Sequence, residues 1–157
     1  MKLTTNFTLN ELVYSVTAQA NNIDNRPSVK VVANLKALCE NVLQPLRNYL
    51  GCPIIISSGF RCAELNKKVG GRPNSQHLLG EAVDFVVPQR NLKDVFNYIK
   101  AHLPYDQLLY EYNKLINGYT FHTEATVTIE NKLLIITKHN RINTLFSYSL
   151  NKLNLPR

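Results

Sequence analysis

The ten residues 75–84, SQHLLGEAVD, carry the features on which the fold and the candidate site depend. A polar loop precedes them, Gly80 marks a turn, and the residues from Ala82 to Val87 form a short apolar run of the kind found in buried strands. His77 and Asp84 therefore lie on either side of a turn that leads into a strand. Imidazole nitrogen and carboxylate oxygen are both zinc ligands, so this stretch predicts two ligands of a metal site.

Helical patterns dominate the chain before this stretch. Thr8 is a suitable cap for a short helix, which we expect to fade near residues 21–22. Ser28 begins a longer helix, in which apolar residues recur at three- and four-residue spacing. Pro45 predicts a bend in this helix, and Gly51 predicts its end.

Strand patterns concentrate in the middle and at the end of the chain. After the long helix we predict a strand at 53–57, a helix at 63–69, a strand at 82–87, a helix at 92–102 and strands at 107–112, 119–128 and 133–137. Helices that come first and strands that come later indicate an α+β fold, with a mainly antiparallel sheet and helices packed on it. The length predicts a single domain over residues 1–157, in which 138–157 form a C-terminal extension.

The charge of the chain is positive but not clustered. Lys and Arg number 18 against 11 Asp and Glu, a formal net charge of +7, which favours attraction to anionic polymers. The basic residues are scattered, without a basic arm or interleaved stacking aromatics, which argues against a nucleic-acid-binding domain. A steep dependence of nucleic-acid affinity on salt would be the mark of that alternative.

Neither a signal peptide nor a transmembrane segment is predicted, so we expect synthesis as a soluble cytoplasmic chain. The three cysteines, Cys39, Cys52 and Cys62, contain no Cys-x-x-Cys pair. Buried or idle thiols are the expectation, and a bridge between Cys52 and Cys62 stays open. His102 and His139 are expected to be solvated rather than ligands.

On spacing alone, a histidine such as His77 is more often a structural residue than a ligand, and the flanking sequence changes this interpretation. The segments SSGFR (57–61), PNSQH (73–77) and GEAVD (80–84), together with LN (65–66) and GG (70–71), resemble the M15 family of D-Ala-D-Ala-type peptidases, and most closely its small phage and bacterial members. The resemblance continues upstream and covers most of residues 7–125. It implies a Hedgehog/D,D-peptidase fold, a His-Asp-His zinc site, a glutamate base and peptidoglycan stem peptides as substrate.

The resemblance also implies roles for individual residues. His77 and Asp84 match the first two zinc ligands, and Arg61 matches an arginine that holds a substrate carboxylate. A guanidinium group suits that role because it can donate two parallel hydrogen bonds to a carboxylate. Ser75 matches a serine that precedes the first ligand, where it either binds substrate or caps the loop.

The third ligand and the base are expected further along the chain. The segment DQLLYE (106–111) supplies Glu111 as the base, and YTFH (119–122) supplies His122 as the third ligand, although Thr120 stands where the family has tryptophan. Asn-Gly at 117–118 is a strong hairpin signal, and a turn there places Glu111 opposite Glu124 and diagonal to His122, about 7–8 Å away. Glu124 is the alternative base.

The sequence thus predicts a zinc-dependent peptidoglycan peptidase, either a D,D-carboxypeptidase or an endopeptidase. The absence of a predicted signal peptide fits a phage or prophage lysin released by a holin, or a virion component that acts on the cell wall. The alternative within the same fold is a non-catalytic module that retains the metal and binds the wall. Which peptide bond is cut is open at this point, because specificity depends on the shape of the binding groove.

Overall fold

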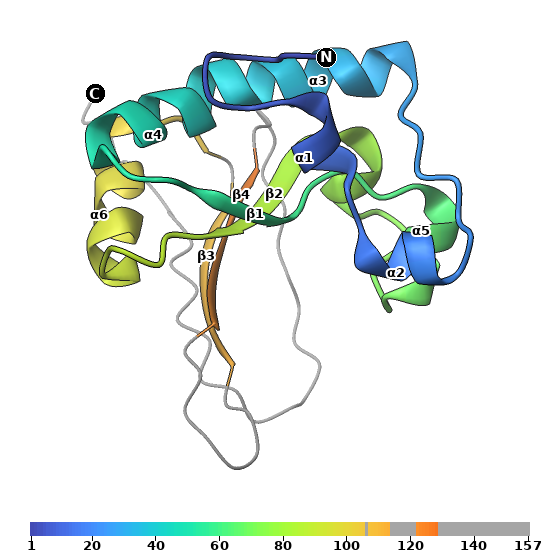
Figure 1. Cartoon of the computed structure of the whole chain (residues 1–157). Coiled ribbons are helices and arrows are strands. Elements are labelled where there is room, and N and C mark those ends of the chain that lie inside the picture. Colours follow the sequence, from blue (N-terminus) through green and yellow to red (C-terminus); the bar gives the residue numbers. More distant parts are fainter. Residues whose placement is uncertain (106, 114–121, 129–157) are drawn as a thin grey trace, which may run out of the picture.

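The computed structural model describes residues 1–105, 107–113 and 122–128 (Figure 1). Its helices are α1 (Leu9–Val13), α2 (Val16–Ala20), α3 (Val29–Leu38), the π-helical turn η1 (Cys39–Leu43), α4 (Gln44–Leu50), α5 (Ala63–Lys68), the 3-10 turn η2 (Gln76–Leu79) and α6 (Leu92–His102). Its strands are β1 (Ile55–Ser58), β2 (Ala82–Val86), β3 (Gln107–Asn113) and β4 (His122–Thr128). The predicted turn at 117–118, the predicted strand at 133–137 and the extension at 138–157 lie outside the described residues.

The four strands form one sheet in the order β1-β2-β4-β3, and each neighbouring pair is antiparallel. This confirms the α+β class and the antiparallel sheet. Glu111 pairs with Glu124 in the β3–β4 ladder, and Asn113 pairs with His122. The predicted register is therefore confirmed in the two strands that flank the turn.

The first predicted helix is two helices. Thr8 and Glu11 form a capping box at α1, in which the Thr8 amide donates to Glu11 Oε2 at 2.7 Å. The chain then leaves the helical conformation at Tyr14, and Ser15 caps α2 by accepting a hydrogen bond from the amide of Ala18 at 3.2 Å. A second capping serine thus restarts a helix that the apolar pattern alone does not divide.

The longer helix begins after Ser28, as predicted, and ends at Gly51, whose φ of 64° is the left-handed conformation of a helix cap. The bend expected at Pro45 takes the form of the π-helical turn η1, which separates α3 from α4 just before the proline. Pro45 has no amide to donate to the preceding turn, so the regular hydrogen-bond ladder is interrupted there.

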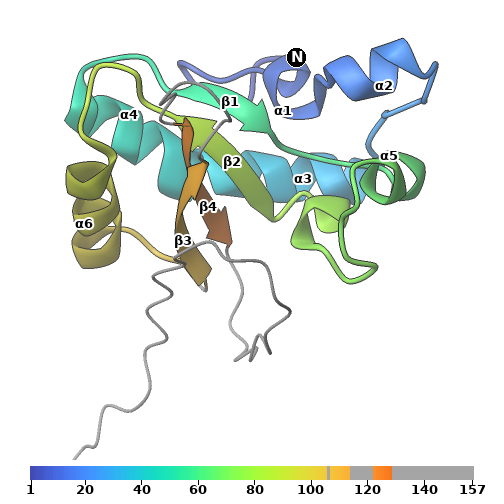
Figure 2. The ribbon, with the colours of Figure 1, turned by 90° about the horizontal axis from the view of Figure 1, so that it is seen from below.

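The helices α3 and α4 lie across one face of the sheet, as the view from below shows (Figure 2). Val83 and Phe85 of β2 are fully buried in the hydrophobic core, together with Leu35, Val42 and Leu46 of the long helix. Because side chains alternate along a strand, Asp84 belongs to the opposite face of β2. Packing of the odd-numbered residues against the helices therefore directs Asp84 away from the core.

Candidate metal centre

His77 lies in η2, with 7% of its surface exposed. Its Nδ1 atom is 2.6 Å from the carbonyl oxygen of Gly59. A carbonyl oxygen can only accept a hydrogen bond, so this contact places a proton on Nδ1, and in the neutral ring the lone pair is then on Nε2. Metal-binding histidines are commonly fixed in this way through their second ring nitrogen.

Asp84 lies in β2 and is buried to a similar extent, with 8% of the residue's surface exposed. His77 Nε2 lies 3.4 Å from Asp84 Oδ1. Two donor atoms that are each about 2.1 Å from a tetrahedral zinc ion are separated by about 3.4 Å. The two atoms thus have the spacing of neighbouring zinc ligands, and the donor set fits the metal that the sequence implies.

Arg61 contacts the other oxygen of the same carboxylate. Its Nη2 atom donates to Asp84 Oδ2 at 2.8 Å, and its Nε atom donates to Ser58 Oγ at 2.8 Å. Both charged groups are largely buried, with 19% of the side-chain surface of Arg61 and 11% of the side-chain surface of Asp84 exposed. A buried carboxylate is costly without a partner, so Arg61 stabilises the charge of Asp84.

The loop from Gly59 to Cys62 is held in place by backbone contacts on both sides. The amide of Phe60 donates to the carbonyl of Leu12 at 2.7 Å, and the amide of Arg61 donates to the carbonyl of His77 at 3.1 Å. A β-carbon on Gly59 would lie 2.2 Å from the Leu12 oxygen, so only glycine fits this approach to α1. The same glycine supplies the carbonyl that orients His77.

The turn that carries His77 is fixed against α3. Gly80 has a φ of 71°, and a β-carbon there would lie 2.9 Å from both a methyl group and the carbonyl of Val31. Asn34 donates from Nδ2 to the carbonyl of Leu79 at 2.9 Å and thereby joins α3 to η2. Ser75 stands at the start of η2, but its side chain makes no capping hydrogen bond.

The structure places Glu111, Glu124 and His122 by backbone register. Asp84 pairs with Thr126 of β4, so alternation puts positions 122, 124 and 126 of β4 on the face of Asp84, together with position 111 of β3. The Glu124 position is diagonal to Asp84, whereas the His122 position is four residues from Thr126, about 13 Å along the strand. Within the described ranges, no three His, Cys, Asp or Glu residues form a group that could hold a metal ion.

The sequence patterns assigned no role to three groups of this site: the Gly59 carbonyl, the Ser58 hydroxyl and the side chain of Asn25. Asn25 donates to the carbonyls of Val13 and Phe60 and accepts from the amide of Cys62 at 2.7 Å. Glycine, serine and asparagine occur in most loops, so their presence alone does not distinguish a supporting role from an ordinary turn.

The cysteines stand apart from the site chemistry. Cys39 and Cys52 are buried, Cys62 is half-buried, and all three are free thiols. The expectation of buried or idle thiols is confirmed, and no bridge joins Cys52 to Cys62. None of the helices in the described part of the chain is both long enough and apolar enough to span a bilayer.

The comparison with protein families agrees with this geometry. The sequence profile of the family described as Peptidase M15 matches residues 5–117, a range that contains Arg61, His77, Asp84 and Glu111 and ends before His122. No curated protein matches the chain. Because the matched range covers well over half of the 157 residues, the chain belongs to the peptidase M15 family.

Proposed function

We propose that the protein is a zinc-dependent peptidase that hydrolyses a peptide bond in the stem peptide or cross-bridge of bacterial peptidoglycan. The observation that carries this proposal is the buried pair of His77 Nε2 and Asp84 Oδ1, 3.4 Å apart, with the second nitrogen of His77 fixed by the Gly59 carbonyl. Membership of the M15 family supports the reaction class, and a Hedgehog/D,D-peptidase-like arrangement is the proposed fold.

In this proposal His77, Asp84 and His122 are the zinc ligands. Zinc, when bound, supplies a Lewis acid that lowers the pKa of water and polarises the scissile carbonyl. His122 belongs to the same face of the sheet as Asp84 by register, but it stands four residues from the β4 position that pairs with Asp84.

The remaining steps are assigned to side chains of the same face. Glu111 accepts the proton of the attacking water and passes it to the leaving amine. Glu124 is the alternative base, favoured by its register position diagonal to Asp84. Arg61 orients Asp84 through Nη2 and can offer its Nη1 hydrogens to a substrate carboxylate, because Nη1 has no partner among the described residues. Ser75, at the entrance of η2, is proposed to contact substrate.

The test is to load purified protein with zinc, measure bound metal by mass spectrometry and follow new amino groups released from peptidoglycan. The wild-type protein should bind one zinc ion and release amino groups, and His77→Ala should lose both properties. His102→Ala is the matched control, because His102 is exposed on α6, where it bonds to and stacks on Tyr98 of the same helix. The release of stem-peptide fragments would also show which bond is cut.

A non-catalytic wall-binding module of the same family is the second candidate, favoured by Thr120, which stands where the family has tryptophan before the third ligand. Tight binding to peptidoglycan without release of amino groups at any zinc concentration would establish it and refute the peptidase. For the peptidase, we propose a phage or prophage lysin, or a virion component, that reaches the cell wall through phage-mediated delivery.

A further inference from the structure

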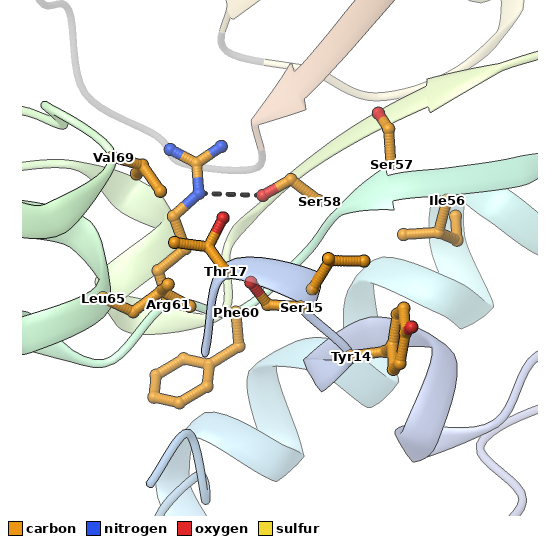
Figure 3. Close-up of a pocket in the computed structure, with 11 residues that line it drawn as sticks. Tyr14, Ser15, Thr17, Ile56, Ser57, Ser58, Phe60, Arg61, Leu65 and Val69 are labelled. Carbon is orange, nitrogen blue, oxygen red and sulfur yellow. Dashed lines mark hydrogen bonds between the residues drawn. The ribbon is translucent and has the colours of Figure 1, made fainter. Parts of the chain in front are cut away.

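The cavity beside β1, which Arg61 and Ser58 line, adjoins the candidate metal centre (Figure 3). A second cavity, of about 430 Å³, lies where the C-terminal end of α4 meets the N-terminal end of α6. This α4–α6 cavity is lined by Tyr49, Leu50, Arg90, Asn91, Asp94 and Val95. The helices α4 and α6 lie at one end of the molecule, and α5, which follows Arg61, lies at the other (Figure 1, Figure 2). The α4–α6 cavity is therefore separate from the candidate metal centre.

One wall of the α4–α6 cavity is an aromatic ring in a fixed position. Tyr49 stacks on Tyr98 of α6, with the ring centroids 3.4 Å apart and an angle of 7° between the ring planes. Because Tyr49 is still 59% exposed, the ring face that Tyr98 does not cover is open to a ligand. The Nη2 atom of Arg90 donates to the carbonyl of Leu50 at 2.7 Å and joins the segment before α6 to the end of α4. A ring fixed in this way loses little conformational freedom when a ligand packs on it.

The rim of the cavity carries both donors and acceptors of hydrogen bonds. Nε and Nη1 of Arg90 and Nδ2 of Asn91 can donate, and the carboxylate of Asp94 can accept. Asn91 uses its Oδ1 atom to accept from the amide of Lys93 at 2.9 Å, which caps α6. The other groups make no hydrogen bond to any described residue, and all three rim side chains are exposed. They are therefore available to a ligand.

The charges and the apolar surface of the cavity define the chemical class of that ligand. Because Arg90 and Asp94 carry opposite charges, the rim presents no net charge that would attract a simple anion or cation. An uncharged ligand that both donates and accepts hydrogen bonds can use both side chains. The open face of Tyr49 and the buried floor of Leu50 and Val95 require an apolar surface on the same ligand. A sugar ring combines these properties, with C–H groups on its face and polar groups around its edge.

We propose that the α4–α6 cavity binds an N-acetylated sugar of the peptidoglycan glycan strand. The C–H face of the sugar packs on Tyr49, and the acetamido group lies over the floor of the cavity. Its carbonyl accepts from Arg90 or Asn91, its N–H donates to Asp94, and its methyl group contacts the apolar floor. The role of this contact in substrate recognition rests on the proposed peptidase function, to which it adds the sugar chain that carries the stem peptides.

Binding of tetra-N-acetylchitotetraose, an uncharged oligomer of N-acetylglucosamine, tests the site in an NMR titration of the zinc-free protein. The amide signals of Tyr49 and Asp94 should shift, and Tyr49→Ala and Asp94→Ala should each weaken binding at least about tenfold. Tyr14→Ala is the matched control, because Tyr14 is 57% exposed but lines the cavity beside β1. If Tyr49→Ala fails to fold, Asp94→Ala alone decides, since its side chain is exposed.

Cellotetraose provides a second comparison, because it has the same kind of sugar ring without acetamido groups. It should bind to the wild-type protein at least about tenfold more weakly than tetra-N-acetylchitotetraose. Equal binding of the two oligomers, no binding of either, or an equal loss in Tyr14→Ala would overturn the proposal.

Hydrolysis distinguishes failure of this proposal from failure of the peptidase function. With intact peptidoglycan, Tyr49→Ala should raise KM by about tenfold and leave kcat unchanged, whereas its KM for a sugar-free stem peptide should equal that of the wild type. Sugar binding by a protein that releases no amino groups would reject the peptidase and keep the sugar site. Hydrolysis of peptidoglycan with the same KM in Tyr49→Ala and wild type would keep the peptidase and reject the role of the sugar site in substrate recognition.

Discussion

Arg61 Nη2 lies 2.8 Å from Asp84 Oδ2, so the arginine that the family resemblance assigns to the substrate is also the ion-pair partner of a candidate zinc ligand. The pair joins two elements, the loop after β1 and the strand β2, whose positions both depend on the core beneath them. A buried charge pair therefore joins these two elements at the candidate site.

Replacing Arg61 with methionine should destabilise the metal-free protein by about 3 kcal/mol, because the Asp84 carboxylate is left buried without its cation. Arg61→Lys should recover part of this loss, since one ammonium group cannot reach Ser58 and Asp84 with the same fixed geometry. Urea unfolding in the presence of a chelator measures both. Arg26→Met is the control: the Arg26 side chain is 88% exposed, and its loss should leave the midpoint unchanged.

As pH rises above about 9, the free energy of unfolding should decrease, in part because of Cys39. Burial, together with Glu11 and Glu40, raises the pKa of the Cys39 thiol from 9.0 to about 12. Between these two values the unfolded chain ionises and the folded chain does not, so rising pH favours unfolding. Cys39→Ala should show a shallower loss of stability from pH 9 to pH 11 in urea titrations. An identical pH profile in the two proteins would contradict this assignment.

Gly59→Ala should weaken zinc binding by about tenfold or more, because the new β-carbon would displace the loop whose carbonyl orients His77. Zinc affinity by competition with a chelating dye measures the effect. Gly70→Ala is the control, since Gly70 has open space around it, and its φ of 75° makes the substitution costly without moving the carbonyl that orients His77. Equal losses of zinc affinity in both variants would show that a general loss of stability, and not the carbonyl contact, is responsible.

Asn25→Ala should cost about 2 kcal/mol of stability and raise KM, because it removes three hydrogen bonds that join the Arg61 loop to α1. Asn41→Ala removes a single bond within one turn of helix and should cost much less. Thermal unfolding and peptide hydrolysis together distinguish loop positioning from general stability: a loss of stability without any change in KM would argue against the positioning role.

The third ligand can be identified by comparing His122→Ala with Glu124→Gln. If His122 closes the zinc site, His122→Ala should lower zinc affinity by two orders of magnitude or so, and Glu124→Gln should keep the metal. Metal content and chelator competition decide between them. Retention of zinc by His122→Ala with loss in Glu124→Gln would make Glu124 the ligand, in agreement with its register position diagonal to Asp84.

The sequence by itself determined the elements and the identity of the candidate ligands. Periodicity located α6 and the long helix, Gly51 marked the end of that helix, and the segment 75–84 indicated His77 and Asp84. These features are local: they depend on spacing, caps and glycine conformations that a few neighbouring residues impose.

Only the tertiary structure decided how the ligands meet. The 3.4 Å contact between His77 and Asp84 joins η2 to β2. The bond from His77 to Gly59 spans 18 residues of the chain, and the pairing of Arg61 with Asp84 spans 23. The cavity beside β1 likewise requires Thr17 and Ile56 to approach across the fold. Such contacts arise from packing of the core and from strand register, which local patterns do not specify.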